Sequence, residues 1–174
     1  MSEKRSYYNK TKLLNALNES KIPYTVKKHV PFYTVKDSEL NRSGLQGIHT
    51  KNIFLKNKKN QFFLFSCYEN QIIDIKRLSK SLNIGNLSFA KEDKLRDILG
   101  VLPGSVSPFG LLNDSESLVS FYIDNKIFEN KYVNFHPLEN TSTVNLKSAD
   151  LLSFLLEKNK IVHTFNFNTY SLID

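Results

Sequence analysis

The sequence predicts a single α+β domain, over residues 1–174, with helices flanking a mixed, mainly antiparallel sheet. Three observations support this fold class. Segments with apolar residues at helical spacing interleave with short apolar runs typical of strands. These segments do not follow the regular strand-helix alternation of a doubly wound parallel sheet. No internal repeat, low-complexity tract or linker divides the chain, whose length suits one domain.

The first part of the chain is predicted to form a helix, a strand and a second, short helix. Residues 10–18 place three leucines on one helical face. Residues 24–29 alternate apolar and polar side chains, which is typical of a strand. Asp37 or Ser38 is expected to cap the short helix, which ends before a loop at residues 43–47.

A β-hairpin is predicted next, because the apolar runs Ile53–Leu55 and Phe62–Phe65 flank a polar turn at residues 57–60. Two helices are then expected, one beginning at Asp74 and one over residues 91–99.

The second half of the chain begins with its densest group of glycines and prolines, residues 103–110, which predicts a loop. Strands are predicted at residues 118–123, 132–135 and 143–146. Ser148 is expected to cap a final helix.

The charge balance favours an anionic partner. The 24 Lys and Arg residues outnumber the 17 Asp and Glu residues and give a net charge of +7, which suits nucleic acid or membrane headgroups. Cys67 is the single cysteine, so an internal disulfide and a multi-cysteine metal site are excluded. The sequence has no apolar run of a signal peptide or membrane span. We expect a cytoplasmic protein with no metal and no cofactor.

Familiar catalytic motifs are missing from the sequence. It has no P-loop, no dinucleotide fingerprint and no histidine pair at the spacing of a zinc site. Cys67 lies in an apolar run, where a buried structural thiol is a more frequent finding than a nucleophile. The four histidines are scattered, but His136 precedes Pro137, which restricts its backbone to extended geometry and makes it a candidate site residue.

Two further candidates follow from residue chemistry. Gly104 would let a substrate approach the backbone and would offer amides to an anionic oxygen, although such loops are often purely structural. Lys51 stands where a strand is expected to begin, which would hold its ammonium group at the rim of the sheet, although most lysines are simply solvated. Residue chemistry alone therefore favours a basic α+β domain with a loop-lined pocket and selects no reaction.

Four blocks of the sequence resemble a known family. They are residues 50–59 (TKNIFLKNKK), 87–90 (LSFA), 99–114 (LGVLPGSVSPFGLLND) and 134–141 (NFHPLENT). In order and spacing they resemble the YbaK/ProX-type aminoacyl-tRNA deacylases, which also occur as an insertion domain in bacterial prolyl-tRNA synthetases. The Leu-Leu-Asn-Asp ending of the third block is similar to the freestanding, PrdX-like branch of that family.

The resemblance implies a YbaK-like fold and a hydrolase that removes alanine mischarged on proline tRNA. Water is expected to attack the aminoacyl ester with assistance from the terminal ribose hydroxyl of the tRNA. Two alternatives are release of cysteine or another small amino acid, and a non-catalytic module that binds tRNA or a synthetase. The implied partners are the acceptor end of tRNA(Pro) and, transiently, prolyl-tRNA synthetase or an elongation factor, with no membrane.

The family's site residues transfer onto eight positions. The catalytic group falls on Lys51, Gly104 and Ser105, where Lys51 would act as a positioning charge and the two amides would cap the oxyanion. Substrate contacts are expected from Asn52, Val106, Pro108, Phe109 and His136. His136 and the residues around Val106 and Phe109 are expected to shape a pocket that admits alanine and excludes proline.

Overall fold

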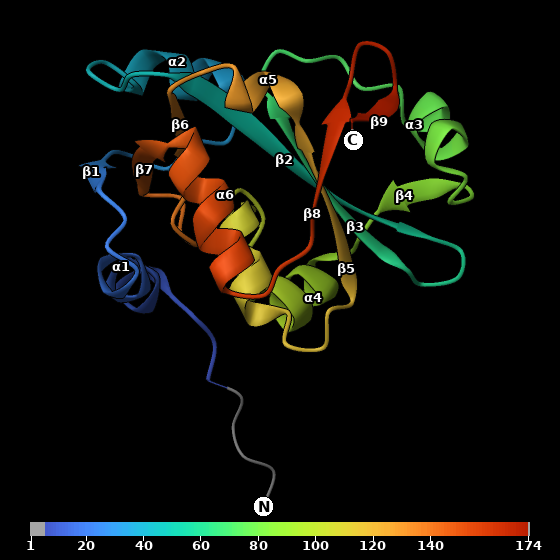
Figure 1. Ribbon diagram of the computed structural model, residues 1–174, viewed down its shortest axis with the longest axis horizontal. Coiled ribbons are helices and arrows are strands. Elements are labelled where there is room, and N and C mark those ends of the chain that lie inside the picture. The colour runs from blue at the N-terminus through green and yellow to red at the C-terminus, as the bar shows by residue number, and fades with distance from the viewer. Residues whose placement is uncertain (1–5, 174) are drawn as a thin grey trace, which may run out of the picture.

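Nine strands form one sheet in the computed structural model, which describes residues 6–173 (Figure 1). The strands are β1 (Tyr24–Lys28), β2 (Ile48–Asn57), β3 (Phe62–Tyr68), β4 (Leu87–Phe89), β5 (Val119–Asp124), β6 (Tyr132–Phe135), β7 (Ser142–Lys147), β8 (Val162–Asn166) and β9 (Ser171–Ile173). The helices are α1 (Lys10–Glu19), α2 (Val35–Asn41), α3 (Ile75–Leu82), α4 (Glu92–Lys94), η1 (Leu95–Leu99), η2 (Pro108–Asn113), α5 (Asn125–Phe128) and α6 (Ser148–Glu157).

The strand order is β1-β7-β6-β2-β3-β5-β8-β9, with β4 added to β2. The pairs β1–β7, β2–β3, β2–β4, β6–β7 and β8–β9 are antiparallel. The pairs β2–β6, β3–β5 and β5–β8 are parallel. This arrangement confirms the predicted mixed, mainly antiparallel sheet with flanking helices.

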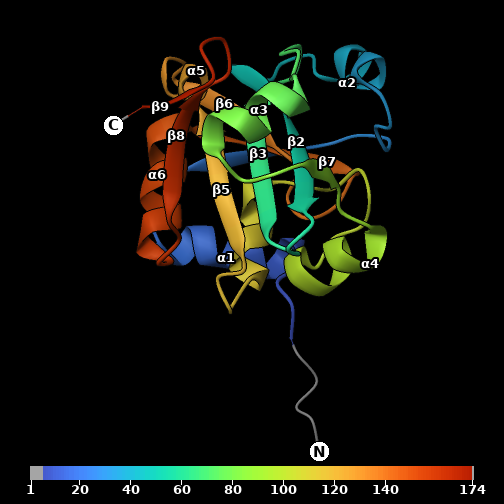
Figure 2. The same cartoon turned by 90° about the vertical axis from the view of Figure 1, so that its right-hand side faces the viewer.

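The two edges of β2 are occupied differently. One edge pairs with β3 continuously over residues 50–56. The other edge pairs with β6 at Ile48 and His49 and with β4 at residues 55–57. In the described chain, residues 50–53 therefore have no strand partner on this second edge. The sheet therefore has a break in its pairing between β6 and β4. In Figure 2, α2 lies at the same upper end of the molecule as the start of β2.

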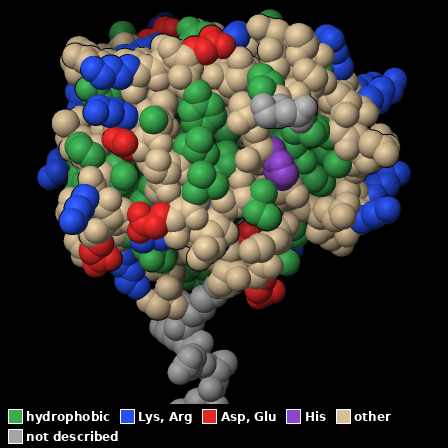
Figure 3. Space-filling model, in the orientation of Figure 1, with side chains coloured by type: hydrophobic (Ala, Val, Ile, Leu, Met, Phe, Trp, Pro, Cys, Tyr) green, Lys and Arg blue, Asp and Glu red, His purple; other side chains and the backbone are tan. Residues whose placement is uncertain are grey.

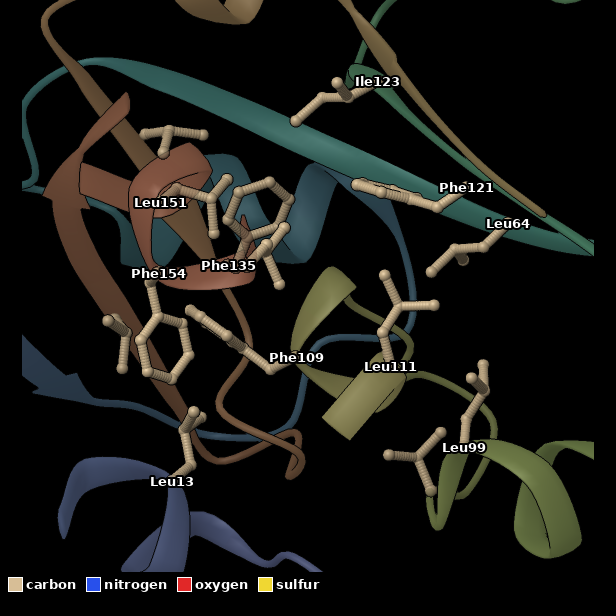
Figure 4. Close-up of a cluster of buried hydrophobic side chains, with 14 of the residues drawn as sticks. Leu13, Leu64, Leu99, Phe109, Leu111, Phe121, Ile123, Phe135, Leu151 and Phe154 are labelled. Atoms are coloured by element: carbon tan, nitrogen blue, oxygen red, sulfur yellow. The ribbon is translucent and has the colours of Figure 1, made fainter. Parts of the chain in front are cut away.

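Two apolar clusters hold the sheet and its helices together. The larger cluster joins α1, α6, η1 and η2 to one set of strand side chains, and its aromatic centre is Phe109 with Phe135 and Phe154 (Figure 4). The smaller cluster includes Phe65, Phe165 and Leu78 of α3. Burial of such side chains, about 1.5–3 kcal/mol each, makes the sheet a firm platform for the residues along β2.

Two predicted starts of elements are wrong by a few residues. β2 begins at Ile48, ahead of the expected position at Lys51, because the parallel pairing with β6 extends the strand backwards. The cap of α2 is Thr34, whose hydroxyl accepts from the Asp37 amide while the Asp37 carboxylate accepts from the Thr34 amide. Asp37 is thus the reciprocal partner in a capping box and not the cap itself.

The last helix also starts differently from the prediction. Lys147 precedes α6, and Ser148 is its first helical residue, with a buried hydroxyl that has no hydrogen-bond partner among the described residues. The other predicted helices and strands are confirmed to within a few residues. The sequence did not predict β4, α5, β8 or β9, which are three to five residues long and depend on neighbours for their pairing or packing.

The glycine and proline cluster is more ordered than a loop, since its second half forms the 3-10 helix η2. Asn113 at the end of η2 donates to the Leu99 carbonyl oxygen at 2.9 Å and accepts from the Tyr8 amide at 2.6 Å. Gly100 has a φ of +67°, and a Cβ there would lie 2.5 Å from Asn113 Nδ2. The two ends of the third resemblance block, residues 99–114, are therefore held together by the Asn113 side chain.

Candidate active site

Two adjoining cavities open where β2 lacks a strand partner. The larger, of about 180 Å³, is lined by Phe32, Tyr33, Thr34, Ser38, Thr50, Lys51, Glu69 and His136. The smaller, of about 30 Å³, is lined by Phe32, Ser38, His49, Thr50, Asn52, Asn134, Phe135, His136 and Thr143. Four residues line both cavities: Phe32, Ser38, Thr50 and His136. The geometry therefore joins an open cavity at Lys51 to a small polar one beside it.

Lys51 lies in the interior of β2, half-buried and opposite Cys67 of β3. Cys67 is fully buried, and its burial raises the pKa of the thiol to about 12, although the nearby Lys51 charge opposes this. The thiol is thus protonated at neutral pH and cannot serve as a nucleophile. The prediction that Cys67 is a structural thiol is confirmed.

Asn52 and Thr50 follow the alternation of the strand and turn toward the smaller cavity. The Asn52 side-chain oxygen accepts a hydrogen bond from the Ser66 hydroxyl, which fixes the amide group. The Thr50 hydroxyl donates to the Asn134 carbonyl oxygen at 2.9 Å. This bond joins β2 to β6 just beyond their last paired residues. Thr50 and Asn134 both line the smaller cavity.

His136 closes the other side of both cavities. Its Nδ1 lies 3.0 Å from the Ser142 carbonyl oxygen, and because a carbonyl only accepts, Nδ1 carries the proton. Burial lowers the pKa of His136, the Ser142 bond opposes this, and the neighbouring His29 lowers it further. The ring is therefore neutral at pH 7 and keeps Nε2 as a hydrogen-bond acceptor.

An aromatic stack supports this wall. The His29 ring stacks on Phe32 with centroids 3.7 Å apart, and His136 lies 5.8 Å from Phe32 at a steep angle. His29 Nε2 lies 2.9 Å from the Thr143 hydroxyl. Phe32 is only 8% exposed, so the stack is packed into the body of the protein.

The loop with Gly104 and Ser105 stands behind the cavities and does not line them. Gly104 has a φ of +87°, and a Cβ there would lie 2.8 Å from the Asn140 amide nitrogen. The Asn140 side chain in turn bonds to both the amide and the carbonyl of Phe32. Gly104 is thus connected to the cavity wall through Asn140, which bonds to Phe32.

Ser105 is expected from the resemblance to offer its amide to the oxyanion. In this structure the amide donates to the Leu102 carbonyl oxygen at 3.1 Å, and the residue is 5% exposed. Ser105 is not among the residues that line either cavity. Its role in capping the oxyanion stays a prediction.

Val106, Pro108 and Phe109 also lie outside the lining of both cavities. Phe109 is fully buried between Phe135 and Phe154 in the larger core cluster (Figure 4). Pro108 is buried at the start of η2, and Val106 packs against the same cluster. Since Phe135 lines the smaller cavity, Phe109 supports its wall from behind, and none of the three residues lines the cavity itself.

Six residues that line the larger cavity were missed in the sequence: Phe32, Tyr33, Thr34, Ser38, Thr50 and Glu69. They come from segments far apart in the chain that only the fold brings together. One signal was present, because His29, Pro31 and Phe32 form a ring-rich segment directly after the predicted strand. Glu69 carried no such signal.

A third cavity, of about 410 Å³, lies beyond Glu69 and His49. Arg42 forms an ion pair with Glu69 there, and Glu69 lines this cavity as well as the one at Lys51. Burial lowers the pKa of His49 to about 4, and the charge of Arg42 adds to this effect. The wall between the cavities therefore holds one charged pair and one neutral histidine.

The described surface carries many basic side chains. Lys and Arg side chains lie mainly around the rim of the face in Figure 3, with apolar groups nearer its centre. Within residues 6–173, no group of three or more His, Cys, Asp and Glu side chains is placed to bind a metal ion. Over the same residues, no helix has the length and apolar character that crossing a membrane requires.

Comparison with known proteins indicates the same family as the four sequence blocks. The prolyl-tRNA editing protein ProX of Acetoanaerobium sticklandii is 35% identical over 168 residues, covering 95% of this chain and 96% of the relative. The zebrafish (Danio rerio) prolyl-tRNA synthetase associated domain-containing protein 1 is 34% identical, over 81% of this chain and 78% of the relative.

A solved structure, described as a proposed trans-editing enzyme for prolyl tRNA synthetase, superposes with a TM-score of 0.66. It is 16% identical and covers 97% of this chain and 99% of its own. The family of the aminoacyl-tRNA editing domain matches residues 29–154, a range that contains all eight predicted site positions. The predicted aminoacyl-tRNA deacylase is thereby confirmed at the level of the family. With its fold, its sequence blocks and its relatives in agreement, the chain belongs to the aminoacyl-tRNA editing domain family.

Proposed function

We propose that this protein acts in trans to hydrolyse mischarged tRNA(Pro), and that its main substrate is the alanyl ester. Two relatives support the tRNA, because their names refer to prolyl-tRNA editing or to prolyl-tRNA synthetase. The observation that carries the proposal is the placement of Lys51, Thr50 and His136 around one opening in the sheet, beside a second cavity of about 30 Å³.

The reaction needs no enzyme nucleophile. An aminoacyl ester is already activated, so an enzyme has only to position water and stabilise the developing oxyanion. Cys67 is excluded as a nucleophile by a pKa of about 12. Water attacks the carbonyl carbon with help from the terminal ribose hydroxyl of the tRNA, and the ester bond to the ribose breaks.

Lys51 supplies the positive charge in this scheme. Lys51 lines the larger cavity, whereas the Ser105 amide is already bonded elsewhere. Lys51 therefore stabilises the oxyanion as a point charge. The neutral His136 ring, with Nε2 as an acceptor, orients the water or the ribose hydroxyl, and Asn52 contacts the substrate from the smaller cavity.

The smaller cavity accounts for selection of the amino acid. About 30 Å³ of such space holds a water molecule or a methyl group and little more. The alanine methyl group fits beside Phe32 and His136, whereas the proline ring does not. A synthetase that selects by size gains only about 1–3 kcal/mol of selectivity from one methylene group. This second pocket adds further selection between alanine and proline.

The tRNA docks by its acceptor end. The net charge of +7 favours binding to the phosphates before the terminal adenosine enters the opening. We propose the cytoplasm as the site of action, with only transient contact to prolyl-tRNA synthetase or an elongation factor.

A deacylation panel tests this function. The purified protein is mixed with alanyl-, cysteinyl-, seryl- and prolyl-tRNA(Pro), and each rate is divided by the rate in buffer. Alanine release should be fastest, and proline release should stay at the buffer rate. Fastest release of cysteine would replace the proposed substrate, and no release above buffer would leave a non-catalytic tRNA-binding module.

The variant His136→Ala sharpens the panel, because it enlarges the smaller cavity. Release of proline should then become measurable while alanine release falls. If proline release stays at the buffer rate in the folded variant, His136 does not set the size of the pocket.

A further inference from the structure

An acidic residue, Glu69, lines the larger cavity together with Lys51. Glu69 directly follows β3, its amide donates to the His49 carbonyl oxygen at 3.0 Å, and Lys51 is opposite Cys67 in the same ladder. Lys51 and Glu69 are therefore diagonal neighbours across the two strands, within reach of long side chains. Both line the cavity, yet no ion pair of 4 Å or less joins them in the described chain. The cavity thus separates a cation from an anion.

Glu69 is held in place and not merely solvated. It is 5% exposed, and its Oε1 atom pairs with the Arg42 guanidinium group. Arg42 also reaches Glu39 on α2 at 3.3 Å. Among the described residues Oε2 accepts no hydrogen bond, and this atom keeps some contact with solvent. One oxygen therefore fixes the carboxylate while the other stays available to a ligand.

We propose that Glu69 binds the α-ammonium group of the aminoacyl ester. This inference rests on the proposed function. An aminoacyl ester carries its cation one carbon away from the carbonyl group that reacts, so the two ends need opposite charges close together. Lys51 meets the developing oxyanion and Glu69 meets the ammonium group, and the side chain of the amino acid then points toward Phe32 and His136.

The proposal predicts a class of substrate and a class that is refused. Esters with a free ammonium group are bound, whereas N-acylated or hydroxyacyl esters lose the charge-assisted bond and leave the carboxylate facing an uncharged group. Peptidyl-tRNA is such an N-acylated ester. Glu69 would therefore keep this hydrolase from releasing growing peptides.

The test compares three esters and three proteins. Wild-type protein, Glu69→Gln and Glu39→Gln are assayed on alanyl-, N-acetylalanyl- and lactyl-tRNA(Pro), with each rate divided by the rate in buffer. The lactyl ester replaces only the ammonium group by a hydroxyl group. Glu39→Gln is the matched control, because Glu39 pairs with the same guanidinium group from a side chain that is 51% exposed.

Wild-type protein should prefer the alanyl ester over both analogues. Glu69→Gln should lower alanyl hydrolysis about tenfold to hundredfold, the effect of one charge-assisted hydrogen bond, and should leave lactyl hydrolysis unchanged. Glu39→Gln should keep the wild-type preference. If Glu69→Gln only disturbed folding, the hydrolysis rates of all three esters would fall together. A fall for the alanyl ester alone therefore reports the loss of the carboxylate.

Two results would overturn the role of Glu69. One is an unchanged preference for the alanyl ester in folded Glu69→Gln. The other is wild-type hydrolysis of the lactyl ester as fast as the alanyl ester, which needs no variant to fold. If the wild-type protein hydrolyses none of the esters, the proposed function itself fails, and this inference falls with it.

Discussion

Residues 50–57 of β2 and the segment from Gly104 to Asn113 both belong to blocks that resemble the editing family, but they occupy different places in the fold. Lys51 and Asn52 are half-buried and face the two cavities. Phe109 and Asn113 are at most 4% exposed and bond or pack inside the protein. Blocks that resemble the family therefore include both residues that line the cavities and residues that are buried in the core.

Substitution of the core aromatic should separate the two regions most strongly. We expect Phe109→Ala to lower the free energy of unfolding by about 3–5 kcal/mol, because a large fully buried ring is lost. Urea denaturation measures this change, with Phe109→Leu as the milder control. A loss below about 1 kcal/mol would mean that Phe109 is not in the core, and would reopen its role as a pocket wall.

Acid should weaken the wall between the cavities before it affects the core. His49 has a pKa of about 4 in the folded protein and about 6.5 when unfolded, so the fold favours its neutral form. This contribution is complete above pH 6.5 and is lost as the pH falls toward 4. It amounts to at most about 3 kcal/mol, and to less because His49 is partly exposed.

Unfolding free energies measured at several pH values test this contribution. The slope between pH 6.5 and 4 should be clearly smaller in His49→Gln than in the wild-type protein. Equal slopes in the two proteins would show that folding does not lower the pKa of His49.

A third prediction concerns the indirect action of Gly104 on the site. Gly104→Ala should cost about 1–2 kcal/mol of stability, because its φ of +87° is unfavourable for any other residue. The new Cβ would also displace the Asn140 side chain, which lies 2.8 Å away and holds Phe32. We therefore expect deacylation to slow as well.

Gly44→Ala is the matched control for this effect. Its φ of +82° is similar, but nothing lies within 4 Å of the added Cβ. It should lose stability to a similar degree and retain deacylation. Equal activity in the two variants would show that Asn140 does not transmit the position of Gly104 to the site.

Sequence patterns were sufficient for most of the fold. Apolar spacing identified α1, α3, α6 and the hairpin of β2 and β3, because their stability comes from one continuous apolar face. It did not identify β8 or β9, and their strand geometry depends on pairing with β5 and with each other. Short elements of this kind are determined by their neighbours and not by their own residues.

The site was only partly predictable for the same reason. The resemblance pointed to Lys51, Asn52 and His136, and all three line the cavities. It could not reveal that the Ser105 amide is already bonded to Leu102, nor that Glu69 reaches the cavity from the far end of β3. These facts depend on the register of strands and turns, which one sequence does not display.

We propose that the ester is hydrolysed at the opening beside Lys51. The most direct test of this proposal is the single-turnover rate of alanine release from alanyl-tRNA(Pro) by the wild-type protein, Lys51→Met and Lys56→Met. Lys56 belongs to the same strand but bonds to Asn60 at the hairpin turn and lies outside both cavities. Lys51→Met should lower the rate about 10²–10³-fold, the usual effect of losing one oxyanion-stabilising group, while Lys56→Met stays near wild type. A folded Lys51→Met protein with a near wild-type rate would show that hydrolysis does not depend on Lys51.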